Sequence, residues 1–115
     1  MTQFPKKLAA WAVSIAAISS PNVAFSAPSA TDLTHCKTMS EIASAVMGAR
    51  QAGVRMSAAM ESASKADDYW ATISSTLIEE AYKEPIRSDE IKKVAIAEEF
   101  EDTIYASCLR TRNKN

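Results

Sequence analysis

The stretch HCKTMSEIASAVMGARQAG, residues 35–53, decides the fold. It joins a cysteine to a predicted helix that has a capping signal at its start and a glycine at its end. Thr38 and Glu41 have the spacing of a capping box, so we expect the first helix to begin at Thr38. Apolar residues then recur at helical spacing, at Met39, Ile42, Ala43, Val46 and Ala49. The stretch predicts an amphipathic helix that starts just after Cys36.

Gly48 and Gly53 are the only two glycines of the chain. Gly48 falls on a stripe of small residues with Ser44 and Ala52, and small side chains let another backbone approach closely. We expect this close packing to offset the cost of about 1 kcal/mol for glycine in a helix; a hinge is the alternative. Gly53 is expected just past the helix end in the left-handed conformation, with a continuous helix as the alternative.

Three more helices follow from caps and apolar spacing. Ser57 is expected to cap a short helix that runs to about Ser62. Ser64 or Asp67 is expected to cap the next helix, which Pro85 ends near Tyr82 or Lys83. Its inner face is formed by Trp70, Ile73, Leu77 and Ala81, widened by Ile78 and Tyr82.

The last helix is expected to begin after Ser88 as its cap, with Asp89 and Glu90 in its first turn. Arg110 and Arg112 lie at its other end, where the helix dipole favours basic residues. Its predicted inward stripe consists of Ile91, Val94, Ala97, Phe100, Ile104 and Cys108.

The whole pattern is all-α, since no stretch alternates apolar and polar residues as a half-buried strand does. We expect a small helical bundle of three main helices and one short helix over residues 36–112, with a flexible leader at 27–35 and a tail at 113–115. A link between Cys36 and Cys108 would make the first and last helices antiparallel neighbours.

Residues 1–26 have the three parts of an export signal. Lys6 and Lys7 precede the apolar stretch LAAWAVSIAAI, residues 8–18, which is too short to span a bilayer. Ala24 and Ser26 then indicate cleavage before Ala27, with cleavage after Ala27 as the alternative. Removing 26 residues from the 115-residue chain leaves 89. We therefore expect a periplasmic or secreted protein with no stable membrane insertion after cleavage.

Cys36 and Cys108 are the only cysteines, and an even pair in an exported protein is typically a disulfide. They lie 72 positions apart, and closing so long a loop stabilises a fold by roughly 4 kcal/mol in the chain-entropy model. A metal site is disfavoured because the chain has one histidine, His35, directly beside Cys36. The expected role is a structural disulfide with no metal and no cofactor.

The net charge and the absence of catalytic motifs argue against two classes of function, nucleic-acid binding and catalysis. Loss of the two signal lysines leaves 11 basic residues against 14 acids, a net charge of about −3, so nucleic acid is an improbable partner. No nucleophile-elbow or phosphate-loop pattern occurs, and we expect no enzyme activity. The candidate interaction surface lies beside the Gly53 turn, where arginine and methionine suit recognition: Arg50, Gln51, Arg55, Met56 and Met60. The alternative is that the arginines are solvated or paired and the methionines fill the core.

Several motifs, taken in order, resemble a group of small exported helical proteins of proteobacteria and their phages. They are Cys36, RQAGV at 50–54, Met56 to Met60, EEAYKEP at 79–85 and FEDTIYASC at 100–108. The resemblance covers nearly all of the chain after residue 26. It implies a periplasmic helical domain held by one disulfide, and it supplies no reaction and no ligand.

Two functions are compatible with these features. The first is a non-catalytic module that binds another protein. The alternative is a periplasmic acid-stress chaperone, because neutralising the 14 acids at low pH would leave roughly +11 on the processed chain and loosen the fold.

Overall fold

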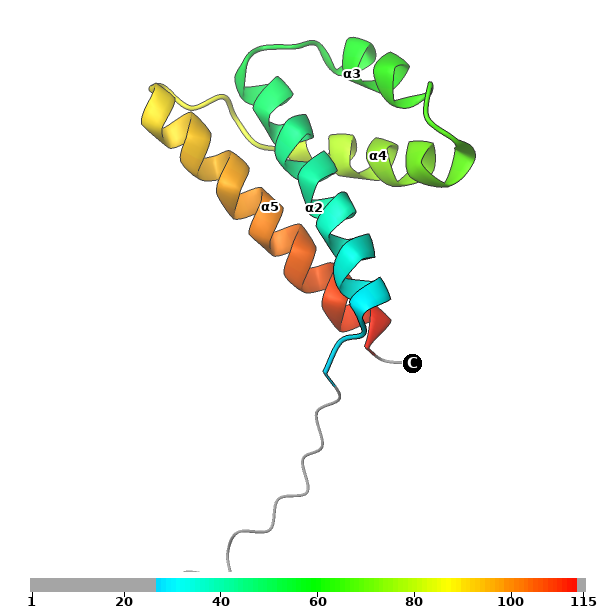
Figure 1. Cartoon of the computed structure of the whole chain (residues 1–115). Helices are drawn as coiled ribbons and strands as arrows, with labels where there is room; N and C mark the ends of the chain where they lie inside the picture. Colours follow the sequence, from blue (N-terminus) through cyan, green and yellow to red (C-terminus); the bar gives the residue numbers. More distant parts are fainter. Residues whose placement is uncertain (1–26, 114–115) are drawn as a thin grey trace, which may run out of the picture.

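The computed structural model describes residues 27–113, and within them the chain forms four helices and no strand (Figure 1). They are α2 (Ala30–Gln51), α3 (Met56–Ala63), α4 (Asp68–Ala81) and α5 (Glu90–Arg112), of 22, 8, 14 and 23 residues. The predicted all-α helical class is confirmed. The expected export signal at 1–26 and the last two tail residues, 114–115, lie outside the described residues.

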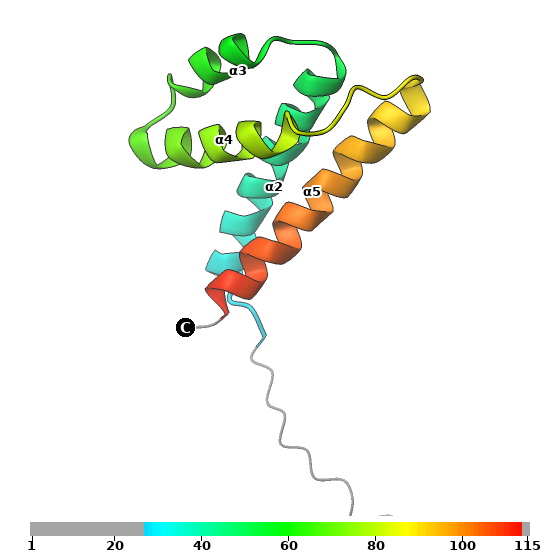
Figure 2. The ribbon, with the colours of Figure 1, turned by 180° about the vertical axis from the view of Figure 1, so that it is seen from behind.

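Helix α2 is the centre of the arrangement. In both views α5 runs along one side of α2 and α4 crosses its other side, while α3 lies next to α4 (Figures 1 and 2). The two long helices lie close together near the C-terminus of the chain and move apart toward the start of α5.

Two contacts close the narrow end of the α2–α5 pair. The predicted disulfide between Cys36 and Cys108 is present, with the two Cα atoms 5.6 Å apart. One turn further out, the Arg112 guanidinium donates to the Asp32 carboxylate over 2.6 Å. The first turns of α2 therefore lie beside the last turns of α5.

Helix α2 begins eight residues earlier than the expected start at Thr38, so the flexible leader predicted at 27–35 is wrong for residues 30–35. Ser29 is the cap, and its hydroxyl accepts from the Asp32 backbone N–H. Thr38 lies inside the helix and donates its hydroxyl hydrogen bond back to the Thr34 carbonyl. The contact of Asp32 with Arg112 shows why the extra turns are ordered: they pack on the end of α5.

Gly53 ends α2, as predicted, with a positive φ of 85°. The Gly53 N–H donates to the Arg50 carbonyl and the Val54 N–H to the Ala49 carbonyl, which is the Schellman pattern of a helix C-terminus. The close packing predicted at Gly48 is wrong, because a Cβ built there would meet no atom within 4 Å.

The remaining helix boundaries follow the predictions in part. Asp67 caps α4 by accepting from the Trp70 N–H, and α4 ends at Ala81, close to the predicted stop. The two serine caps are wrong. Arg55 is the cap residue of α3, and Asp89, one residue after Ser88, caps α5 by accepting from the Lys92 N–H.

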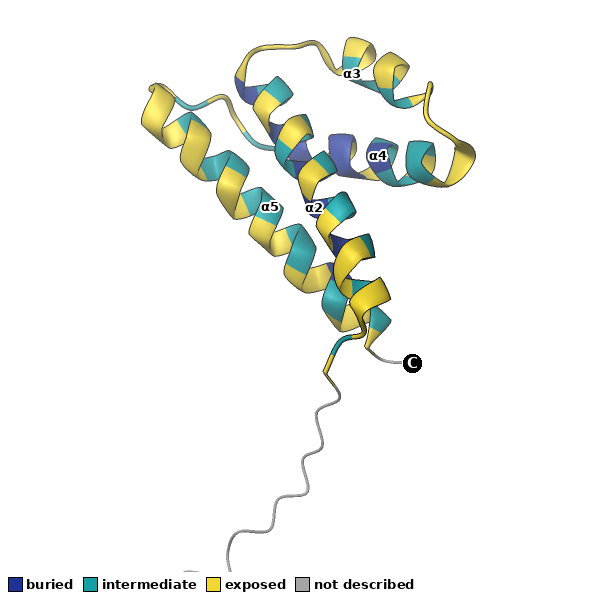
Figure 3. Cartoon of the chain, in the orientation of Figure 1, coloured by how far each residue is buried: buried dark blue, intermediate teal, exposed yellow. Residues whose placement is uncertain are grey.

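The core lies between α2 and α4, and α5 contributes only one buried residue, Cys108 (Figure 3). The inward stripe predicted for α5 is wrong in its first half, because Ile91 is 82% exposed and Val94 is 56% exposed. The predicted inner face of α4 is confirmed at Leu77, Ile78 and Ala81. The buried apolar residues of the described chain are Cys36, Ala43, Met47, Leu77, Ile78, Ala81 and Cys108.

Candidate functional site

Gln51, one of the five residues of the predicted interaction surface, is only 3% exposed and therefore does not face outward. Its amide nitrogen donates to the Pro85 carbonyl over 3.0 Å, and its amide oxygen accepts from the Arg87 N–H over 2.7 Å. The amide of Gln51 thus provides hydrogen-bond partners for two backbone groups of the segment between α4 and α5, the Pro85 carbonyl and the Arg87 N–H. Gln51 is a structural residue that holds this connector against the end of α2.

Arg50 has a similar role on the neighbouring side of α2. Its Nε donates to the Glu84 carbonyl over 2.9 Å, and its guanidinium carbon lies 5.1 Å from the centre of the Tyr82 ring. Tyr82 in turn donates its hydroxyl hydrogen bond to the Val54 carbonyl over 2.8 Å. Arg50 is thus partly covered and committed to joining α2 to the end of α4.

The other three predicted residues lie on or next to α3. Arg55 and Met56 are exposed, and Met60 is half-buried. Among the five residues, Gln51 is therefore buried and Arg50 contacts the end of α4, while Arg55 and Met56 face solvent.

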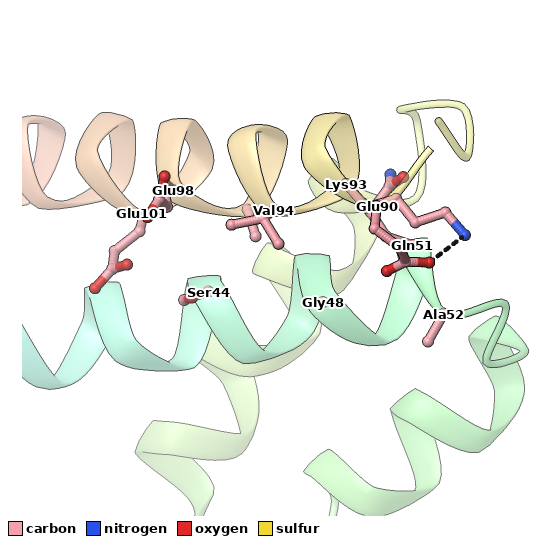
Figure 4. Close-up of a pocket in the computed structure, with 10 residues that line it drawn as sticks. Ser44, Gly48, Gln51, Ala52, Glu90, Lys93, Val94, Glu98 and Glu101 are labelled. Atoms are coloured by element: carbon pink, nitrogen blue, oxygen red, sulfur yellow. Dashed lines mark ion pairs between the residues drawn. The ribbon is translucent and has the colours of Figure 1, made fainter. Parts of the chain in front are cut away.

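A groove with a volume of about 660 Å³ lies between α2 and α5. The α2 wall carries small side chains at Ser44, Gly48 and Ala52. On the α5 side, Val94 and Ala97 form the apolar floor of the groove between charged residues. The Val94 side chain points toward α2 (Figure 4). The small-residue stripe noted in the sequence therefore faces an unfilled groove and not a closely packed helix.

Most of the charged side chains that line the groove are acidic. Its charged lining residues are Glu90, Lys93, Glu98 and Glu101. Lys93 pairs with Glu90 over 3.6 Å, and Glu101 extends from α5 toward α2 (Figure 4). Within the described residues Glu98 and Glu101 form no ion pair, so two carboxylates remain uncompensated beside the apolar floor.

A separate cluster joins the start of α2 to the start of α4. The His35 ring lies 5.2 Å from the Trp70 ring, and its Nε2 is 3.0 Å from the Tyr69 hydroxyl. Burial, followed by the charge of Arg112, lowers the pKa of His35 below its usual value of 6.5. The hydrogen bond from Arg112 is the main cause that lowers the pKa of Asp32. The sequence placed His35 in a loose leader and so missed this cluster.

The described residues contain no group of three His, Cys, Asp or Glu side chains placed to hold a metal ion. Between residues 27 and 113, no helix combines the length and the hydropathy that a membrane span needs. We take the groove as the candidate site because of its volume and lining, which combine an apolar floor with acidic edges.

No family model matches this chain, and neither a curated protein nor a solved structure is significantly similar to it.

Proposed function

We propose that the protein is exported, cleaved before Ala27, and acts in the periplasm or outside the cell as a non-catalytic module that binds another protein. On this proposal the antiparallel first and last helices, joined by Cys36 and Cys108, are the rigid frame of the module. Disulfides persist in oxidising compartments, and this one is buried, with Cys36 0% and Cys108 6% exposed. The proposal includes membership in the group of exported helical proteins that the sequence resembles.

The observation that carries the binding role is the exposure of apolar residues on the first half of α5. Ile91 and Val94 are 82% and 56% exposed, although both lie in an ordered helix. Burying an isoleucine or valine side chain stabilises a fold by about 1.5–3 kcal/mol relative to leaving it in water. The isolated chain does not gain this free energy at Ile91 and Val94. Contiguous exposed apolar surface of this kind typically marks an interaction site.

Site-specific photocrosslinking in intact cells tests this function. A photoreactive residue replaces Ile91 in one variant and Thr103 in the control. Thr103 is also exposed on α5, but it is polar and lies nine positions beyond Val94. We expect a discrete crosslinked protein from position 91 and none from position 103. Equal patterns from the two positions, or no crosslink from position 91 across several growth conditions, would contradict the proposed function.

The acid-stress chaperone is the second candidate, and a specific observation favours it. Four acids lie within five consecutive positions of α5, at Glu98, Glu99, Glu101 and Asp102, and none forms an ion pair within residues 27–113. Protonating them near pH 2–3 would remove this cluster of negative charge from α5 and strengthen repulsion between the basic residues. Suppression of client aggregation at low pH distinguishes the candidates: protection favours the chaperone, and its absence removes it.

A further inference from the structure

We propose that the groove between α2 and α5 binds one amphipathic helix of a partner protein, with an apolar face bordered by lysine or arginine. This inference deepens the proposed function and rests on it, because it names the chemistry of the partner. Its evidence is the shape of the groove, its apolar floor and the sign of its charges.

The shape fits a helix because three of the four residues that line the groove on the α2 side are small, the fourth being Gln51. Ser44, Gly48 and Ala52 follow one another at intervals of four and form a smooth strip. Nothing lies within 4 Å of a Cβ built at Gly48, so this strip is open to a third backbone. The lining residues of α5 run from Glu90 to Glu101, a helical length of about 17 Å, which matches about three turns of a partner helix.

The floor supplies the apolar contact. Val94 points across the groove and remains 56% exposed, and Ala97 lies one turn further along α5. A helix laid in this groove would cover these side chains with residues at its own i, i+3 and i+4 positions, which is how helix-in-groove recognition works.

The charges select a basic helix. Three carboxylates and one ammonium line the groove, and the ammonium of Lys93 is already paired with Glu90. Glu98 and Glu101 remain to attract cations, and complementary charges of this kind govern the orientation and specificity of a complex. A partner helix with acidic flanks would meet like charges at both positions.

Binding of model peptides to the purified disulfide-bonded protein tests the inference. Three fluorescent peptides of equal length are compared by anisotropy: a Leu/Lys amphipathic helix, the same apolar face with Glu in place of Lys, and a Leu/Lys sequence scrambled to abolish the apolar face. We expect the first peptide to bind at least about tenfold more tightly than either of the others, with affinity falling as salt rises.

Matched variants locate the binding. Gly48→Trp fills the groove, and Thr103→Trp adds the same bulk elsewhere on α5. The double variant Glu98→Lys/Glu101→Lys reverses the groove charge, and Glu61→Lys/Glu79→Lys makes the same change in net charge on α3 and α4. Each groove variant is expected to weaken the Leu/Lys peptide about tenfold, whereas the controls change its affinity less than about twofold. Circular dichroism and thermal unfolding confirm that each variant is folded.

Equal loss in the control variants would overturn the inference, because the affinity for the peptide would then not depend on the groove residues. Tighter binding of the Glu peptide would also overturn it. Sedimentation of the protein without peptide gives the remaining outcome: a dimer that Gly48→Trp dissociates would make a second copy the occupant. If position 91 crosslinks a protein in cells but the Leu/Lys helix does not bind, the interaction function stands and the helix inference fails.

Discussion

Replacing Gly48 with alanine is expected to stabilise the protein, although the sequence pattern had indicated a glycine required for close packing. Gly48 lies in the interior of α2, and a Cβ added there meets no atom within 4 Å. The substitution therefore adds no clash and gains the difference in helix propensity, about 1 kcal/mol. For a domain of about 90 residues this raises Tm by roughly 5 °C.

Gly53→Ala is the matched control, since it makes the same chemical change at the other glycine. Gly53 has a φ of 85°, where an L-residue with a Cβ is strained, and nothing else crowds the position. We expect this variant to be destabilised by about 1 kcal/mol. Urea unfolding of both variants, followed by circular dichroism, should separate them by about 2 kcal/mol.

The reasoning is refuted if Gly48→Ala is destabilised as much as Gly53→Ala. That result would mean that another backbone or side chain contacts Gly48, as close packing requires, and the groove would then be filled in solution. An unchanged urea dependence (m-value) in both variants shows that the difference arises from stability and not from a change in the surface exposed on unfolding.

Three further predictions concern the frame of the molecule. Cys36→Ala/Cys108→Ala is expected to lower the free energy of unfolding by about 4 kcal/mol, measured in urea against the oxidised parent, and a loss below about 1 kcal/mol would contradict a stabilising disulfide. Gln51→Leu should cost about 1–3 kcal/mol by the same assay, because it leaves the Pro85 carbonyl and the Arg87 N–H without their partner; a neutral effect would mean that water replaces the amide. Because the pKa of His35 is lowered in the folded state, its contribution to stability is complete above pH 6.5 and is lost as the pH falls through 6.5 toward the folded pKa. A titration of the His35 ring by NMR should give a pKa below 6.5, and His35→Gln should remove this part of the pH dependence; a ring pKa above 6.5 would reverse the predicted sign.

Much of the helical layout could be predicted from local signals. Gly53, Asp67 and Pro85 act on their own neighbours, by a left-handed turn, a side-chain cap and a steric stop, so their effects were readable without tertiary structure. The disulfide was readable because two cysteines allow one intramolecular pairing.

The parts that were missed depend on contacts between distant segments. Helix α2 extends to Ala30, where Ser29 caps it and Asp32 also meets Arg112, 80 positions away in the sequence. Gln51 is buried because its amide faces the connector before α5, and a polar side chain gives no sign of such a partner in its own neighbourhood. The apolar spacing of Ile91 and Val94 predicted burial, but both are exposed, and opposite Val94 the α2 side of the groove carries mainly the small residues Ser44, Gly48 and Ala52.

The oxidation state of Cys36 and Cys108 tests the account most directly. Both the proposed export of the protein and the link between α2 and α5 depend on the disulfide. Protein recovered from the extracytoplasmic fraction is unfolded in guanidinium without reductant and treated with a thiol reagent. We predict no reactive thiol per chain, and two after reduction. Two reactive thiols before reduction would contradict the account.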